Sequence, residues 1–294
     1  MPRRHRHGID LNTLNTRSRK RAYGRAPRRS SRLTVLVFGL ALASGSAVPA
    51  TAAPLKVAAT HRVYADIASE IGGKAIRTHL WRRVPRSAQQ CRSWADIIIY
   101  DGNATEPTRP QLRRYCQSAK LVIRMRDLAK GSPPENPALW YQPGVIPRLA
   151  NVLTAEYIRL DSKHRHRYAR ALGRLMARLR PAYQELARLK RRVAGLPVVV
   201  QGPAATGLGA VLSLRITRLR SRNGHLLFPK NARALLYDTR SKVASRKLTT
   251  AVARTGLAAF QVKTAEPAGT HYPSWLLHQY RELAQTLTGK PPPH

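Results

Sequence analysis

The chain has 294 residues, 43% of them hydrophobic, and a formal net charge of +39. This length is enough for two lobes of ordinary size, while the two cysteines are too few for a Cys-rich structural zinc site. No segment after residue 48 approaches the roughly 18 uninterrupted apolar residues that a transmembrane helix requires.

The positive charge favours anionic partners, but its distribution does not single out a binding face. Arginines and lysines are scattered along every segment, and no recognised nucleic-acid motif accompanies them. Scattered charge is equally typical of a general compositional bias. We therefore expect no nucleic-acid partner, and the open alternative is an interaction protein that holds an acidic partner on its basic surface.

Residues 1–53 have the pattern of an export signal. An arginine-rich start is followed by a small and apolar stretch at 33–48 and by Ala50-Thr51-Ala52, which resembles an A-x-A cleavage site. The apolar core at 33–42 is too short for a permanent anchor, so we predict a cleaved signal peptide and a mature periplasmic chain beginning near Pro54. An uncleaved anchor is the alternative, and Arg28-Arg29 also allows a twin-arginine signal.

Residues 54–144 alternate between strand and helix patterns and form the predicted N-terminal lobe. The predicted strands are 55–59, 76–81, 96–100 and 121–125, and the predicted helices are 63–71, 87–94 and 110–118. Such βαβ alternation predicts a mainly parallel sheet with helices on both faces.

The two cysteines, Cys91 and Cys116, lie in successive predicted helices that flank one strand. An oxidising compartment would permit a disulfide between them, and two free buried thiols are the alternative.

A long helix is predicted at 161–194, within a connecting segment of residues 145–195. Apolar residues recur there every three or four positions, while Arg and Lys occupy the opposite face. Asp161-Ser162 offers an N-cap, Gly195 and Pro197 offer a stop, and Pro181 should kink the helix without ending it. At about 50 Å the helix is longer than one small domain needs, so it can join two lobes.

The alternation returns in residues 196–294, the predicted C-terminal lobe. The predicted strands are 198–201, 234–238 and 258–262, and the predicted helices lie near 208–214, 241–255 and 274–287. The fold class is therefore α/β, with two lobes of βαβ units and mainly parallel sheets joined by a long connecting helix. This is the architecture of a solute-binding protein.

Ligands of parallel α/β sheets bind outside the carboxyl ends of the strands. The candidate ligand-contacting residues are Thr60, His61, Asp101, Asn103, Trp140 and Gln201. Catalytic patterns are missing from the sequence: there is no serine elbow, and the glycines of "QGPAATGLGAV" lack the Lys-Ser/Thr of a P-loop. We predict a binding protein and not an enzyme.

Four segments in order resemble the periplasmic metal-binding proteins of zinc and manganese ABC transporters. They are "LKVAAT" with the following "IGG", "ADIIIYDG", "NPALWYQP" and "AEPAG". The resemblance spans residues 55–287 and implies a permease in the inner membrane as partner, a small ligand or metal ion as cargo, and a metal held by three histidines and one carboxylate. We also expect a monomer.

Most of the implied metal ligands are missing from this chain. Ala138 stands where the resemblance implies one histidine, the loop at 82–94 that should carry another is short, and the third falls near Gly202-Pro203. Only the acidic position is kept, as Glu266. We therefore predict at most weak zinc or manganese binding, dependent on Glu266 and His61. A shifted site of His61, Glu266 and Asp101 is conceivable, and an ordinary hydrogen-bonded histidine is the alternative.

Overall fold

The computed structural model describes residues 53–91, 95–129, 138–222, 225–238 and 244–289. Residues Thr51–His294 form one compact unit. The predicted signal peptide lies outside the described residues except for its last position. Within the described ranges, no helix combines the length and apolar character needed to cross a membrane.

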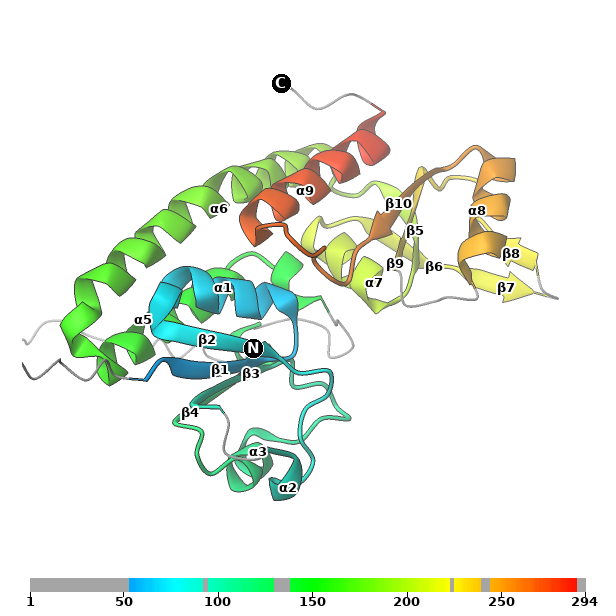
Figure 1. Ribbon diagram of the computed structural model, residues 1–294. Helices are drawn as coiled ribbons and strands as arrows, with labels where there is room; N and C mark the ends of the chain where they lie inside the picture. The colour runs from blue at the N-terminus through cyan, green and yellow to red at the C-terminus, as the bar shows by residue number, and fades with distance from the viewer. Residues whose placement is uncertain (1–52, 92–94, 130–137, 223–224, 239–243, 290–294) are drawn as a thin grey trace, which may run out of the picture. The chain divides into compact units, whose positions relative to one another are not determined.

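The first sheet is parallel, as predicted, and has the strand order β2-β1-β3-β4 (Figure 1). Its strands are β1 (Leu55–Ala59), β2 (Ile76–Leu80), β3 (Ile97–Tyr100) and β4 (Leu121–Arg124). The accompanying helices are α1 (Arg62–Gly72), α2 (Ala88–Cys91), α3 (Arg109–Tyr115) and α4 (Met125–Leu128). The last of these, α4, was not predicted.

Strand β3 is a continuous run of buried apolar residues. Ile97 and Ile99 pack with α1 in one core, while Ile98 packs with α3 in another on the opposite face. All three side chains are fully buried. Because helices cover both faces, consecutive residues of the strand are apolar.

The second sheet is also parallel and has the order β10-β9-β5-β6. Its strands are β5 (Pro197–Gln201), β6 (Arg215–Arg218), β9 (Ala234–Asp238) and β10 (Ala258–Val262). Helices α7 (Pro203–Val211) and α8 (Ala244–Thr255) belong to this half of the chain, with a small antiparallel pair β7 (Arg220–Arg222) and β8 (His225–Leu227).

Two predictions for this half need correction. Helix α7 begins at Pro203 and not near residue 208, because Pro203 has the fixed φ that suits a first helical turn. Strands β6, β7 and β8 were not predicted: β6 and β7 are rich in arginine and carry little of the apolar signal that marks a buried strand, and β8 has only three residues, too few to show a period.

The connecting segment contains two helices, α5 (Val145–Leu160) and α6 (Arg165–Val193), separated by a short 3₁₀ segment Ser162–His164. Helix α6 contains Pro181 without interruption, and it packs against α5, α1 and the closing helix α9 (Tyr272–Thr288) (Figure 1). One continuous cluster of buried apolar side chains includes α6 and both sheets. The long helix thus joins the two sheets through its buried face, as predicted.

The start of α6 differs from the prediction. The helix begins at Arg165, and the Asp161 side chain does not cap it. Instead the Asp161 carboxylate accepts a hydrogen bond from the Tyr168 hydroxyl at 2.7 Å and pairs with His164 Nδ1 at 2.7 Å. These contacts lower the pKa of Asp161 even though burial opposes the shift.

Cys91 and Cys116 form a disulfide, with their Cα atoms 5.4 Å apart. The bond joins the end of α2 to the residue that follows α3. Both cysteines are buried in the core on the outer face of the first sheet, together with Leu112 and Val122. The alternative of two free thiols is therefore excluded.

Replacing both cysteines by serine should lower the free energy of unfolding by about 3.5 kcal/mol, because the bond closes a loop of 25 residues. Urea denaturation under oxidising conditions measures the loss. Reduced wild-type protein should unfold at the same urea concentration as the C91S/C116S variant. Unchanged stability in both would contradict the prediction.

Candidate ligand-binding site

His61 and Asp101 meet at the carboxyl edge of the first sheet. Strands β1 and β3 are direct neighbours, with Ala59 opposite Ile99, so the residues that follow them are adjacent. The His61 Nε2 atom lies 2.6 Å from Asp101 Oδ2. Asp101 is only 2% exposed, so this pair is largely withdrawn from water.

Tyr64 occupies the other oxygen of the same carboxylate. Its hydroxyl donates to Asp101 Oδ1 at 2.7 Å from the first turns of α1. Burial, reinforced by the neighbouring Asp101 charge, raises the pKa of Tyr64 well above its ordinary value, so the hydroxyl keeps its proton and remains a donor. Sequence reasoning missed Tyr64, which has the apolar spacing of an ordinary helix core position.

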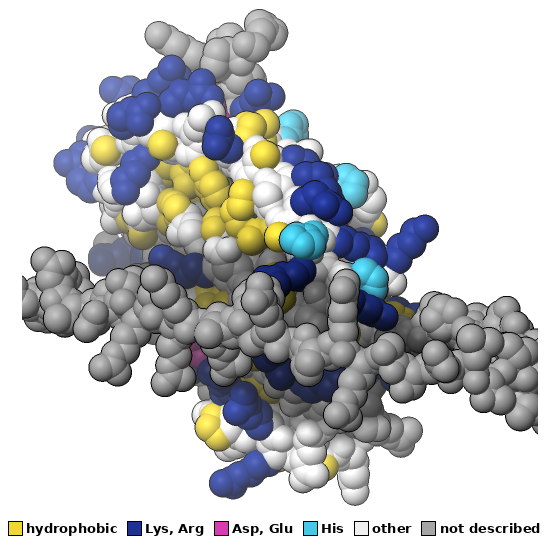
Figure 2. Space-filling view, turned by 90° about the vertical axis from the view of Figure 1, so that its left-hand side faces the viewer, with side chains coloured by type: hydrophobic (Ala, Val, Ile, Leu, Met, Phe, Trp, Pro, Cys, Tyr) yellow, Lys and Arg dark blue, Asp and Glu magenta, His cyan; other side chains and the backbone are white. Residues whose placement is uncertain are grey.

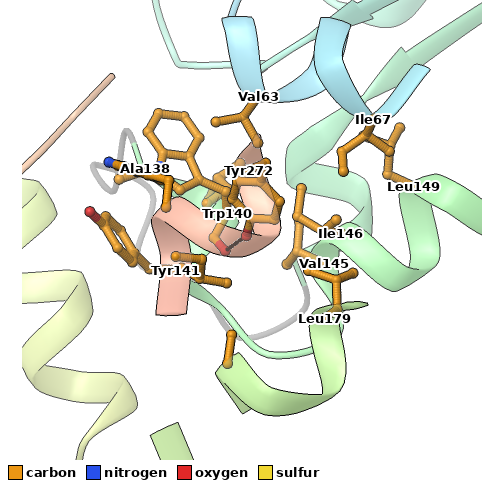
Figure 3. Close-up of a cluster of buried hydrophobic side chains, with 14 of the residues drawn as sticks. Val63, Ile67, Ala138, Trp140, Tyr141, Val145, Ile146, Leu149, Leu179 and Tyr272 are labelled. Atoms are coloured by element: carbon orange, nitrogen blue, oxygen red, sulfur yellow. Dashed lines mark hydrogen bonds between the residues drawn. The ribbon is translucent and has the colours of Figure 1, made fainter. Parts of the chain in front are cut away.

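The His61 ring packs against aromatic side chains. Its centroid lies 5.0 Å from that of Trp140 and 5.5 Å from that of Tyr64. Trp140 was predicted to line a ligand cleft, but its side chain is fully buried in the core, and its carbonyl accepts a 2.7 Å hydrogen bond from Tyr272 (Figure 3). Trp140 therefore packs against the His61 ring from the buried core.

A tight turn follows β3 and positions Asn103. The backbone N–H groups of Gly102 and Asn103 both donate to Glu106 Oε2 at 2.7 Å. Arg126 Nη2 donates to Asn103 Oδ1 at 2.9 Å, so that amide oxygen already has a partner. Burial raises the pKa of Glu106, which the two N–H donors oppose. The Asn-x-x-Glu spacing after a strand is the signal that could have identified Glu106.

Two predicted residues retain polar atoms free for a ligand. The Thr60 hydroxyl and the Gln201 Oε1 atom are buried, and neither has a hydrogen-bond partner among the described residues. Thr60 follows β1, and Gln201 ends β5. Buried polar atoms without partners cost free energy that a bound ligand can recover.

The carboxyl edge of the second sheet carries two carboxylates. Asp238 ends β9, and its Oδ2 accepts from the backbone N–H of Ala204 at 3.2 Å, at the start of α7. Glu266 follows β10 and is 5% exposed; its Oε1 lies 3.4 Å from the Thr270 hydroxyl, whereas Oε2 has no partner among the described residues.

The sequence matches no protein-family profile and no curated protein, but solved structures share its fold. ZnuA aligns with 80% of this chain and 100% of its own at 17% identity, with a TM-score of 0.60. This chain has the ZnuA fold. A Zn(II)-bound mutant variant of AdcAII from Streptococcus pneumoniae gives 13% identity, 80% and 99% coverage and a TM-score of 0.58. The Mn-bound periplasmic metal binding protein from Candidatus Liberibacter asiaticus is 13% identical, and the alignment covers 79% of this chain and 99% of its own, with a TM-score of 0.59.

The ZnuA fold is present here with a donor set that does not fit a tightly held metal ion. Among the described residues, no group of three or more His, Cys, Asp or Glu side chains lies close enough to hold an ion. The structure pairs His61 with Asp101 but does not bring Glu266 into one group with them, so the conceivable shifted site is not assembled.

Ala138 and Gly202, two positions where the resemblance implies a metal-binding histidine, also lack room for a histidine side chain. Ala138 is 1% exposed and belongs to the main core (Figure 3). Gly202 has a φ of +89°, and a Cβ atom there would overlap the Asp238 carboxylate. Histidine at either position would require displacement of packed neighbours.

Burial raises the pKa of Glu266 to about 7, and the neighbouring Asp66 charge adds to the shift, while Thr270 and Arg62 oppose it. The folded-state pKa exceeds the ordinary value of 4.5, so native stability falls as the pH rises from 4.5 through about 7. Glu266→Gln should be more stable than wild type at pH 8, on the order of 2 kcal/mol. The difference should shrink toward pH 4. Urea denaturation across this range measures it, and a difference independent of pH would contradict the prediction.

Proposed function

We propose that this protein is an exported solute-binding receptor of an ABC transporter. It captures a small ligand at the carboxyl ends of its parallel strands and delivers it to a permease in the inner membrane. The observation that carries the proposal is the partly buried His61–Asp101 pair at the sheet edge of a fold shared with ZnuA. In parallel α/β sheets this edge is where ligands bind.

The polar groups at this edge suit binding better than catalysis. Asp101 contacts His61 through one oxygen and Tyr64 through the other, so it holds the imidazole in one orientation. Thr60 and Gln201 each keep an unpartnered buried oxygen: the Thr60 hydroxyl can donate to or accept from a ligand, and Gln201 Oε1 can accept. These groups can hold and orient a small polar ligand by hydrogen bonds.

In this proposal zinc or manganese is at most a weakly bound ligand. Transition metals need three or four side-chain donors in fixed geometry, and His61 and Asp101 supply two that already satisfy each other. Any residual binding would depend on His61 and Glu266. The division into lobes 54–144 and 196–294 around the segment 145–195, and a monomeric state, belong to the same proposal.

Export is the requirement that can be tested first. The mature protein should begin close to Pro54 and should be released from cells by osmotic shock, because the arginine-rich start, the short apolar stretch and Ala50-Thr51-Ala52 form an export signal. N-terminal sequencing of the shock fluid gives the start of the chain. Full-length protein in the cytosolic fraction would remove the receptor function.

A further inference from the structure

A hollow opens on the first sheet, beside the loops that follow β2 and β3. Its volume is about 580 Å³, and its lining includes Trp81, Arg82, Arg83, Arg86, Gln90 and Glu106. The volume falls within the range of about 300–1,000 Å³ that is typical of small-molecule pockets. None of the residues assigned to the receptor site above lines this hollow except Glu106, which supports the turn at Asn103.

The hollow carries an excess of positive charge. Arg82, Arg83 and Arg86 are exposed, and none forms an ion pair with another residue in the described part of the chain. Among the described residues, the Arg86 side chain donates one long hydrogen bond, to the Thr105 carbonyl at 3.4 Å. The single carboxylate of the lining, Glu106, is engaged by two backbone N–H groups. The three guanidinium groups are therefore available to an external anion.

Charge alone does not single out this place, because Lys and Arg side chains are spread over the face shown in Figure 2. What distinguishes the hollow is that the loop carrying its arginines is anchored in the core. Val84 and Pro85 lie between the arginines in sequence and are buried, and Val84 belongs to the core on the outer face of the sheet. The three arginines thus project from a loop that is pinned at its centre.

The far wall of the hollow is fixed as well. Gln90 accepts a hydrogen bond from the backbone N–H of Arg86 at 2.8 Å and is followed directly by Cys91. The disulfide to Cys116 fastens this short helix to the residue after α3. A site whose walls are held before binding loses less conformational entropy when it takes a ligand.

We propose that this hollow binds a small organic oxyanion, a molecule carrying phosphate or carboxylate groups. Guanidinium groups match both by paired hydrogen bonds, and Trp81 adds a flat apolar surface for the body of the molecule. The resemblance places a metal-binding histidine in this same loop, so the chain carries arginines where cation binding would need a neutral donor. The hollow does not include the His61–Asp101 pair, although Glu106 and the turn after β3 adjoin both places, and the proposal does not depend on the receptor function.

The test is calorimetric titration of the purified protein with citrate, pyrophosphate and AMP in 150 mM salt, a concentration that screens scattered surface charge. At least one of the three should bind saturably at one-to-one stoichiometry. The R82Q/R83Q/R86Q variant should bind that probe about 100-fold more weakly or worse, since several charge-assisted hydrogen bonds are lost together. These side chains are exposed, so thermal unfolding should be unchanged; if the triple variant does not fold, R82Q and R86Q singly should each weaken binding about tenfold.

The chain offers a matched control. Arg192, Lys230 and Arg233 line a more open hollow of about 680 Å³ in the second half of the chain. The R192Q/K230Q/R233Q variant removes the same charge and should leave probe affinity within about twofold, because charges far from the ligand are screened. Equal weakening in both variants would overturn the site, as would failure of all three probes to bind. Binding only to phosphatidylglycerol vesicles would also overturn it.

Discussion

Replacing Trp140 by alanine should lower the free energy of unfolding by about 4 kcal/mol. The side chain is fully buried and packs against His61, Tyr64 and Tyr141. Removing it leaves a large cavity, since the surrounding aromatic side chains cannot close around the space. Urea denaturation followed by far-ultraviolet circular dichroism measures the change without relying on tryptophan fluorescence.

Leu80→Ala is the matched control, because Leu80 ends β2 and is 46% exposed. That substitution should change stability by less than about 0.5 kcal/mol. Similar losses in the two variants would mean that Trp140 is not the core residue described above. A loss confined to Trp140→Ala would support its place in the buried core.

The sequence predicted the parts of the fold that rest on local pattern. Three consecutive isoleucines in β3 indicate a strand buried on both faces, and the apolar spacing of α6 indicates one long amphipathic helix. The sequence-based prediction failed where the apolar pattern of a strand is weak, and where a side chain has another hydrogen-bond partner than the one expected. Strand β6 reads Arg-Ile-Thr-Arg, and Asp161 pairs with His164 and Tyr168 in place of capping a helix.

For the candidate site too, the sequence predicted what depends on the order of strands and helices and missed what depends on their packing. The order of strands and helices places His61 and Asp101 at carboxyl ends, but their direct pairing depends on β1 and β3 being neighbours in register. The contribution of Tyr64 depends on the direction in which α1 leaves the sheet. The disulfide was left open because only the fold shows that α2 and α3 share one face of the sheet. Glu266 was grouped with His61 on resemblance, and among the described residues no group of three or more potential metal ligands contains them both.

Zinc should bind the mature protein several orders of magnitude more weakly than it binds a dedicated receptor. Affinity comes from the number and geometry of donors, and Ala138, Gly202 and Pro203 offer no side-chain ligand. Binding through His61 would also have to break its 2.6 Å contact with Asp101. The protein thus has the ZnuA fold without side-chain donors at these three positions.

Calorimetric titration of the purified mature protein with zinc, repeated with manganese, tests that loss most directly. The expected result is no nanomolar site in the wild type, with any residual binding reduced in His61→Ala and Glu266→Ala. His166→Ala removes an exposed histidine of α6 and serves as the control that should change nothing. A nanomolar one-to-one zinc site in the wild type would contradict the account, because it would mean that other residues have rebuilt the metal centre.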